Sequence, residues 1–246
     1  MAENQQNDRP APKKESSLPC RIVTTLILSL LLSIVIEWLC ITFIWPEEGH
    51  LHSKRVMQEE FGWFSTEFQQ SLIYSSPVTL AEQAIQFVHH WLFIKTGIQT
   101  WLSTPTTGLP PLNFREMDWE TIKNTNWMAY LVFYVRAYVE STLYVIIIFI
   151  IRLMIIVLTS PLFILAGIVG FVDGLVKRDL RKFGVARESA FKYHHAKRTI
   201  APIMFIAWVV YLSIPFSIHP NMILIPAALL FGLSISITAT NFKKYL

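Results

Sequence analysis

Residues 141–172 read STLYVIIIFIIRLMIIVLTSPLFILAGIVGFV, a run of 32 residues with one charged side chain, Arg152. An apolar helix needs roughly 20 residues to cross the hydrocarbon core of a bilayer. This run is therefore long enough to span a membrane with residues to spare, and it contains Pro161. We expect a tilted or kinked transmembrane helix whose ends reach beyond the core.

Three other apolar stretches predict membrane crossings, at residues 22–44, 200–218 and 222–240. The first follows basic residues, as a cleavable signal does, but its apolar run exceeds the 7–15 residues of a signal core and no A-x-A cleavage site follows. We interpret it as an uncleaved anchor. Pro202 suits a helix start, and residues 217–221 offer only a tight turn, so the last two spans would form a hairpin.

The predicted fold class is all-α, a polytopic membrane protein with four transmembrane helices and a small helical domain at residues 45–140. The composition supports this class, since 53% of the 246 residues are apolar and 15% are charged, against about 25% charged in a soluble domain. A disordered chain and a water-soluble globule are both excluded for the whole. Cys20 and Cys40 cannot build a disulfide framework, and no C-x-x-C spacing is present. We predict no catalytic residue, no metal ligand set and no cofactor.

The distribution of Lys and Arg indicates the orientation, because cytoplasmic loops retain these residues. Residues 1–21 hold four of them, residues 173–199 hold eight and the tail at 241–246 holds two, together 14 of the 21. Residues 45–140 hold six basic and ten acidic side chains. We therefore expect both termini and the 173–199 loop to be cytoplasmic. Residues 45–140 and the turn of the 200–240 hairpin would lie on the opposite side.

Two amphipathic helices are expected in the outer segment, with a small core of their own. The first carries apolar residues at spacings of 4, 3, 4 and 4, namely Met57, Phe61, Phe64, Phe68 and Leu72. The second begins with a capping box from Thr79 to Glu82. Its stripe alternates spacings of 4 and 3 through Leu80, Ala84, Phe87, Trp91, Ile94, Ile98 and Trp101. We interpret this stripe as internal packing or as a face on the membrane surface, with a partner helix as the alternative.

Four histidines of the outer segment, His50, His52, His89 and His90, are of a residue type that binds zinc or copper. No carboxylate-histidine motif accompanies them, and adjacent histidines point to different faces of a helix. We interpret them as solvated surface histidines.

Glu37 and Arg152 are the ionisable residues inside the predicted spans, where an unpaired charge is costly. At 1.5 Å per residue, Glu37 lies about 10 Å below the outer end of its helix and Arg152 about 16 Å below the start of the next. Because side chains lean toward the helix N-terminus, the two lean toward each other on oppositely directed helices. We predict a salt bridge between them. The alternative, a proton or ion relay, needs more polar groups in line than these spans offer.

Small residues recur every four positions on two of the spans, a pattern that lets helix backbones approach closely in lipid. They are Ala166, Gly170 and Gly174 on one span, and Ala228, Gly232 and Ser236 on the last. The pattern predicts packing seams, and it leaves open whether the neighbouring helix belongs to the same chain.

The loop at 173–199 has eight basic and three acidic side chains. The simpler interpretation is topological retention with contact to anionic membrane lipid. The more specific interpretation is that the loop is a docking site for an acidic or nucleic-acid-handling partner. Its basic residues are Lys177, Arg178, Arg181, Lys182, Arg187, Lys192, Lys197 and Arg198.

Several short sequence motifs indicate a family. They are WPEEG at 45–49 with HS at 52–53, DGLV at 173–176, RDLR at 178–181, RES at 187–189, YHHAKR at 193–198 and FKKYL at 242–246. From about residue 20 to the C-terminus the chain resembles the bacterial integrating-conjugative-element membrane protein family. The resemblance implies an inner-membrane protein encoded among the genes of a conjugative type IV secretion system, near the coupling ATPase. It implies no catalytic activity.

The expected function is therefore that of a non-enzymatic accessory of conjugative DNA transfer, which docks the coupling ATPase or the secretion channel. Direct contact of the basic loop with nucleic acid is a secondary expectation. An enzyme is disfavoured because the chain has no P-loop, G-x-S-x-G, H-E-x-x-H or dinucleotide-binding glycine run. The alternative is a small transporter or channel, for which inverted repeats and a polar midplane site would be expected.

Overall fold

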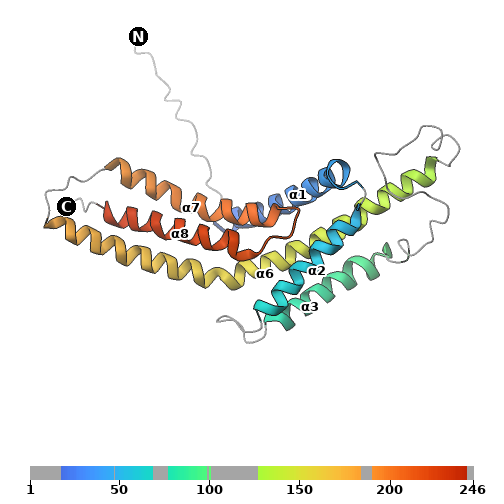
Figure 1. Ribbon diagram of the computed structural model, residues 1–246, viewed down its shortest axis with the longest axis horizontal. Coiled ribbons are helices and arrows are strands. Elements are labelled where there is room, and N and C mark those ends of the chain that lie inside the picture. Colours follow the sequence, from blue (N-terminus) through green and yellow to red (C-terminus); the bar gives the residue numbers. More distant parts are fainter. Residues whose placement is uncertain are drawn as a thin grey trace, which may run out of the picture.

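The computed structural model describes residues 18–46, 48–68, 77–98, 100, 127–183 and 190–242, and every regular element in them is helical (Figure 1). The all-α prediction is confirmed. The elements are α1 (Leu18–Phe43), α2 (His50–Glu67), α3 (Pro77–His89), the π-helix η1 (His90–Lys95), α6 (Trp127–Lys182), α7 (Ala190–Ser213) and α8 (Pro220–Thr240).

Four helical segments are long and apolar enough to cross a membrane, as the sequence predicts. They are Pro19–Phe43, Tyr134–Arg181, Tyr193–Ser213 and Pro220–Thr240. The first and the last agree with the predicted bounds to within three residues. The third begins seven residues before and ends five residues before the predicted 200–218, and Pro202 lies inside α7 and not at its start. The second differs, because its apolar part covers 48 residues, more than twice the length that one perpendicular crossing needs.

α6 is the axis of the molecule. Its 56 residues make a rod about 84 Å long at 1.5 Å per residue, with Pro161 inside it. Figure 1 shows that it runs the whole length of the molecule and bends near its middle, in the yellow part of the chain. A proline removes one backbone hydrogen bond from a helix, and here the helix continues past it because other helices pack on both sides of the bend.

The two halves of α6 have different neighbours. α7 and α8 lie along its C-terminal half, whereas α2 and α3 lie along its N-terminal half (Figure 1). α1 is tied to the N-terminal half, where Trp38 Nε1 donates to Thr142 Oγ1 at 3.0 Å and the Thr42 and Tyr138 hydroxyls are 2.9 Å apart. These pairs run in opposite directions along the two chains, so α1 is antiparallel to α6.

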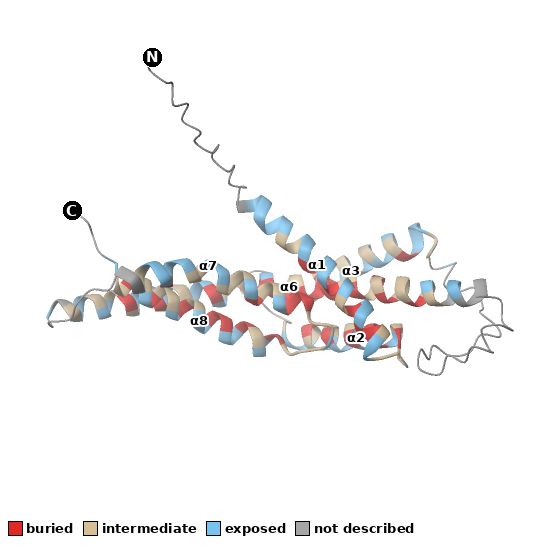
Figure 2. Cartoon of the chain, turned by 90° about the horizontal axis from the view of Figure 1, so that it is seen from above, coloured by how far each residue is buried: buried red, intermediate tan, exposed pale blue. Residues whose placement is uncertain are grey.

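The chain reverses between α1 and α2 at Gly49, whose φ is 53°. Only glycine adopts this left-handed conformation without a steric cost. Because of the reversal, α2 folds back along α6 instead of leading into a separate domain. Buried residues gather where α1, α2 and α6 meet, while the N-terminal part of α1 diverges from the other helices and is exposed (Figure 2).

One hydrophobic core joins residues 50–95 to α6. Phe64 of α2, Ala81 of α3 and Phe93 of η1 belong to the same buried cluster as Ile147 and Ile151 of α6. Residues 45–140 were expected to have a small core of their own, and among the described residues that separation is not found. The reason is that α6 presents apolar side chains well beyond one membrane thickness, and α2 and α3 cover them.

The central residues of the apolar stripe predicted along α3 and η1 are exposed on the surface of the chain. Phe87, Trp91 and Ile94 are 70%, 53% and 52% exposed, while Ala81 and Phe93 are buried. Internal packing is therefore wrong for these three residues. η1 explains part of the error, because a π-helix repeats its hydrogen bonds every five residues and shifts the buried face relative to a 3.6-residue period. Leu72 and Trp101 lie outside the described residues.

Candidate functional site

A buried guanidinium lies at the centre of the molecule. Arg152 is 1% exposed, and all three of its side-chain nitrogens donate hydrogen bonds. Nε lies 3.0 and 2.9 Å from the two carboxylate oxygens of Glu60 on α2, and Nη2 also donates to that carboxylate. An arginine engaged in this two-pronged way is held in one geometry.

The same side chain also holds the connection between α7 and α8. Nη1 donates to the carbonyl oxygens of Tyr211 at 3.1 Å and Ile214 at 2.5 Å, and Nη2 donates to that of Phe216 at 3.0 Å. The Tyr211 carbonyl belongs to the last turn of α7, and those of Ile214 and Phe216 follow the end of that helix. Carbonyls at this position lack a partner within the helix. Arg152 therefore satisfies the exposed backbone of the hairpin and ties α2, α6 and α7 together at one point.

Arg152 pairs with Glu60, so the predicted salt bridge between Glu37 and Arg152 is wrong. Glu37 is buried on α1, but it accepts a hydrogen bond from Ser53 Oγ at 2.6 Å, and Ser53 is 2.7 Å from Ser141 Oγ. Glu60 lies outside the predicted spans, in the segment that was expected to form a separate domain. Instead, α2 folds back along α6 and carries Glu60 to the level of Arg152. One signal was available, because Glu60 lies four residues from both Val56 and Phe64 on the apolar face of its helix.

Burial makes the Glu60 carboxylate dependent on its partner. Desolvation raises the pKa of Glu60, and the hydrogen bonds and charge of Arg152 oppose that rise. Removal of either group would leave the other buried without compensation, which is strongly destabilising. The pair is therefore a structural junction that tolerates loss of both partners better than loss of one.

Three further contacts attach α2 to the hairpin connection. His52 Nε2 is 3.2 Å from the Pro215 carbonyl oxygen, Ser217 Oγ donates to Glu59 at 2.7 Å, and His219 Nε2 is 2.5 Å from Glu67 Oε1. His52 is buried and stacks on Trp45 at 3.9 Å between ring centroids, so the prediction of a solvated histidine is wrong for this residue. The described residues contain no group of three side chains suited to a metal ion.

The predicted small residues lie together between α6 and α8. A Cβ added at Gly170 would be 2.1 Å from the Gly232 carbonyl oxygen, and one at Gly232 would be 2.8 Å from that of Ala166. A Cβ at Gly174 would be 2.6 Å from the Ser236 carbonyl oxygen. The two helices of this α6–α8 seam thus touch through their backbones. Ala228 is also buried in the core on α8.

Ser236 also links the seam to the charged end of α6. Its Oγ donates to Asp173 at 2.5 Å, and Lys177 donates to the same carboxylate at 2.7 Å. Lys177 is therefore partly neutralised by an acidic neighbour one helical turn away.

The other predicted basic residues gather at one end of the molecule, where α6 ends and α7 begins. Arg181 donates to the Asn241 side chain at 3.3 Å, and the Lys197 ammonium lies 5.8 Å from the ring centre of Tyr193. We call this the basic end, and its described cations are Arg178, Arg181, Lys197 and Arg198. Arg187 lies outside the described residues. Lys182 and Lys192 lie on α6 and α7, and their side chains are not among those described.

Comparison with known proteins places the chain in conjugation. Residues 44–243 match the family model described as "IncC plasmid conjugative DNA transfer protein DtrJ-like". The match includes α2, both halves of α6, and the hairpin. No curated protein and no solved structure matches the chain. The family match confirms the resemblance to a conjugative membrane protein family that the short sequence motifs indicated.

Proposed function

Because the chain belongs to the DtrJ-like family of conjugative DNA transfer proteins, we propose that it is a non-enzymatic accessory of conjugation in the bacterial inner membrane. In this proposal the basic end docks the coupling ATPase or the type IV secretion channel, and both termini lie in the cytoplasm. The family match supports the role in conjugation, and the arrangement of charges supports the docking.

The observation that carries the docking proposal is the basic end itself. Its cations come from two helices, with Arg178 and Arg181 on the last turns of α6 and Lys197 on the first turns of α7. Contacts after α8 bring these turns together, since Asn241 accepts from Arg181 and the ring of Phe242 lies 6.0 Å from that of Tyr193. A cluster of positive charges on packed helices attracts an acidic protein surface and orients its approach.

The α6–α8 seam gives this surface a fixed shape. Backbones in direct contact cannot slide past each other without separating, so the turns that carry the cations keep their spacing. The α2 junction around Arg152 fixes the other half of the same helix. A partner bound at the basic end is thus connected through one continuous helix to the outer segment, which supports a role in holding parts of the transfer machinery on both sides of the membrane.

The same geometry supports a role without catalysis. The buried polar groups of the junction, among them Arg152, Glu60, Glu37 and Ser53, hydrogen-bond one another or the backbone. These four groups thus make structural contacts between helices. We therefore propose binding and positioning as the activity of the chain.

A mating experiment tests the docking role. The triple variant Arg178→Gln, Lys197→Gln and Arg198→Gln should lower transfer frequency and recovery of the coupling ATPase with the chain by about tenfold. That is the effect of three charge pairs with a partner surface at about 0.5 kcal/mol each. The amount of chain in the membrane fraction should not change.

The matched control removes the same charge from the opposite half of the molecule, through Lys54→Gln, Arg55→Gln and Lys95→Gln. It should transfer DNA at the wild-type frequency. If both triple variants transfer DNA and retain the ATPase equally well, the basic end has no docking role.

A further inference from the structure

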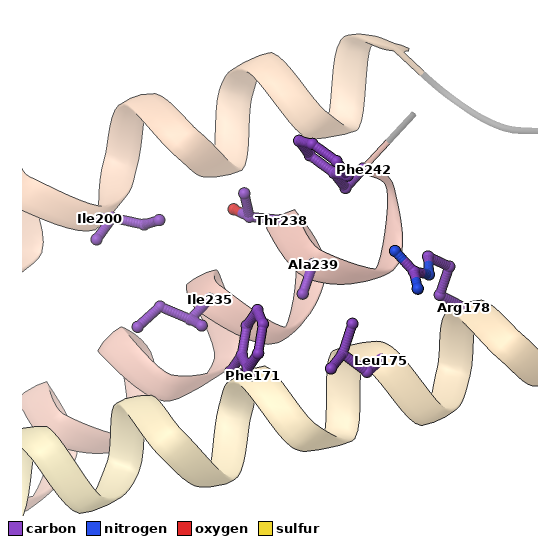
Figure 3. Close-up of a pocket in the computed structure, with 8 residues that line it drawn as sticks. All are labelled: Phe171, Leu175, Arg178, Ile200, Ile235, Thr238, Ala239 and Phe242. Atoms are coloured by element: carbon purple, nitrogen blue, oxygen red, sulfur yellow. The ribbon is translucent and has the colours of Figure 1, made fainter. Parts of the chain in front are cut away.

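An apolar groove opens at the basic end, between the walls formed by α6 and α7 and above a floor formed by α8 (Figure 3). Its volume is about 310 Å³, within the range of small-molecule pockets. Thr238, one of its two polar lining side chains, donates to the Ser234 carbonyl oxygen at 2.7 Å and so presents no unmet hydrogen-bond donor. The lining residues are Phe171, Leu175, Arg178, Ile200, Ile235, Thr238, Ala239 and Phe242.

The groove lies on helix segments that are apolar enough to cross a membrane. Phe171 on its α6 wall and Phe242 at its end are 52% and 48% exposed. These aromatic side chains are therefore only half covered by the chain itself. An acyl chain packed in the groove would make dispersion contacts with the uncovered part of both rings, and such contacts add up to a large attraction.

Arg178 gives the groove a charged mouth. Figure 3 shows its guanidinium extending from α6 toward the end of α8. Its Nε is buried and has no hydrogen-bond partner among the described residues. A carboxylate oxygen of Asp179 is 3.7 Å away, which is an ionic contact outside hydrogen-bond range. The groove thus offers a buried N–H that needs an acceptor.

A second cation, on α7, lies about one helical turn from the lining residue Ile200, beside the groove and not in its lining. Lys197 of α7 is held over the ring of Tyr193, and Tyr193 in turn contacts Phe242. An occupant of the groove therefore meets the positive charge of Arg178 on α6, with the charge of Lys197 nearby on α7. The groove combines an apolar slot with a cationic mouth, which is complementary to a molecule with an apolar tail and an anionic head.

We infer that this groove binds an anionic phospholipid, with one acyl chain against Phe171, Leu175 and Ile235 and the phosphate at Arg178. A guanidinium suits a phosphate because two of its N–H groups can donate to two phosphate oxygens. Basic pockets between membrane helices bind anionic headgroups on the same grounds. The charge at the mouth is what favours an anionic lipid over a neutral lipid or an apolar helix of another protein.

Photocrosslinking tests this site. The full chain is reconstituted in phosphatidylcholine vesicles that contain a trace of phosphatidylglycerol, or of phosphatidylcholine, with a diazirine in one acyl chain. Crosslinks are then mapped by mass spectrometry. We expect the anionic probe to label residues 171–178 and 235–242 about fivefold more than the neutral probe, the effect of about one basic residue near the surface. Equal labelling by the two probes, or labelling elsewhere only, would overturn the inference.

Two variants separate the groove from general surface charge. Arg178→Gln should lower labelling by the anionic probe about fivefold and leave labelling by the neutral probe unchanged. Lys177→Gln removes the same charge from a side chain that pairs with Asp173 outside the groove, so its loss should be clearly smaller. Equal losses in the two variants would mean that the whole basic end attracts lipid and that no groove site exists.

A third variant blocks the slot without changing charge. Thr238→Phe places a ring in the groove and should reduce labelling of residues 171–178 by either probe. Labelling of α1, which lies away from the groove, reports whether the chain is still folded and should stay constant. Unchanged labelling of the groove in this variant contradicts an acyl chain bound there.

Discussion

The two halves of α6 hold their neighbours by opposite means. Around Arg152, charged and polar side chains join α2 and the α7–α8 connection to the helix. Along the C-terminal half, Gly170 and Gly174 join α8 through backbone contact with no side chain between. The comparison shows two solutions to one difficulty, because association of apolar helices in lipid gains little from the hydrophobic effect and depends on packing and polar contacts.

The two solutions fail differently. A polar junction fails when one partner is removed, since the remaining charge stays buried and uncompensated. A backbone seam fails when anything is added, since no space exists for another atom. Substitutions that remove a group from the first and add a group to the second therefore test whether the contrast is real.

The largest effect is expected at the junction. Arg152→Met should lower the free energy of unfolding by about 3–5 kcal/mol, because it leaves Glu60 buried without its partner. Unfolding of the purified chain in mixed micelles measures this loss. Arg55→Met is the matched control, since it breaks an exposed pair with Glu48 and should cost at most about 1 kcal/mol. The double variant Arg152→Met with Glu60→Met should recover part of the stability, and a double variant as unstable as the single one would refute the pairing.

A smaller loss is expected at the seam. Gly170→Ala should cost about 1–3 kcal/mol, because its new methyl group must push the α8 backbone away. Gly62→Ala is the control, as no atom lies within 4 Å of its added Cβ and alanine favours the helix over glycine by up to about 1 kcal/mol. The same unfolding measurement compares them. If Gly170→Ala is tolerated as well as Gly62→Ala, α6 and α8 are not in backbone contact.

The smallest expected effect decides which carboxylate serves Arg152. Glu37→Gln keeps an acceptor for Ser53 and should cost about 1 kcal/mol or less. Glu60→Gln removes the charge that balances Arg152 and should approach the loss seen in Arg152→Met. A ranking in the reverse order, measured by unfolding, would restore the pair that was predicted from sequence.

The outer segment shows where local sequence patterns stop being informative. Phe87, Trp91 and Ile94 lie on helices at the predicted spacing, yet their side chains are exposed. The buried face passes through Ala81 and Phe93 instead. Amphipathic spacing identifies a helix and an apolar face, but it does not identify what that face contacts. The turn of π-helix at His90–Lys95 then rotates the later positions, which a fixed helical period does not anticipate.

The basic end and the seam were more accessible to prediction. The charges of Arg178, Arg181, Lys197 and Arg198 follow from composition near the predicted spans, and the glycine spacing needs only helical geometry. The groove between α6 and α7 was not predicted, because it depends on the distance between these two helices where they pack on α8. Arg178 was predicted as one of eight equivalent cations, and its buried Nε without a hydrogen-bond partner distinguishes it from the other cations of this group whose side chains are described.

Sequence by itself determined that the chain is helical, that four segments are long and apolar enough to cross a membrane, and that its short motifs are those of a conjugative family. These properties are local, because hydropathy, helical period and short motifs are each contained in one stretch of chain. Only the tertiary structure decided that Arg152 pairs with Glu60, that the outer segment shares its core with α6, and that a groove opens at the basic end. Those features depend on the reversal at Gly49 and on close packing between distant segments, where the energy belongs to contacts that no single stretch contains.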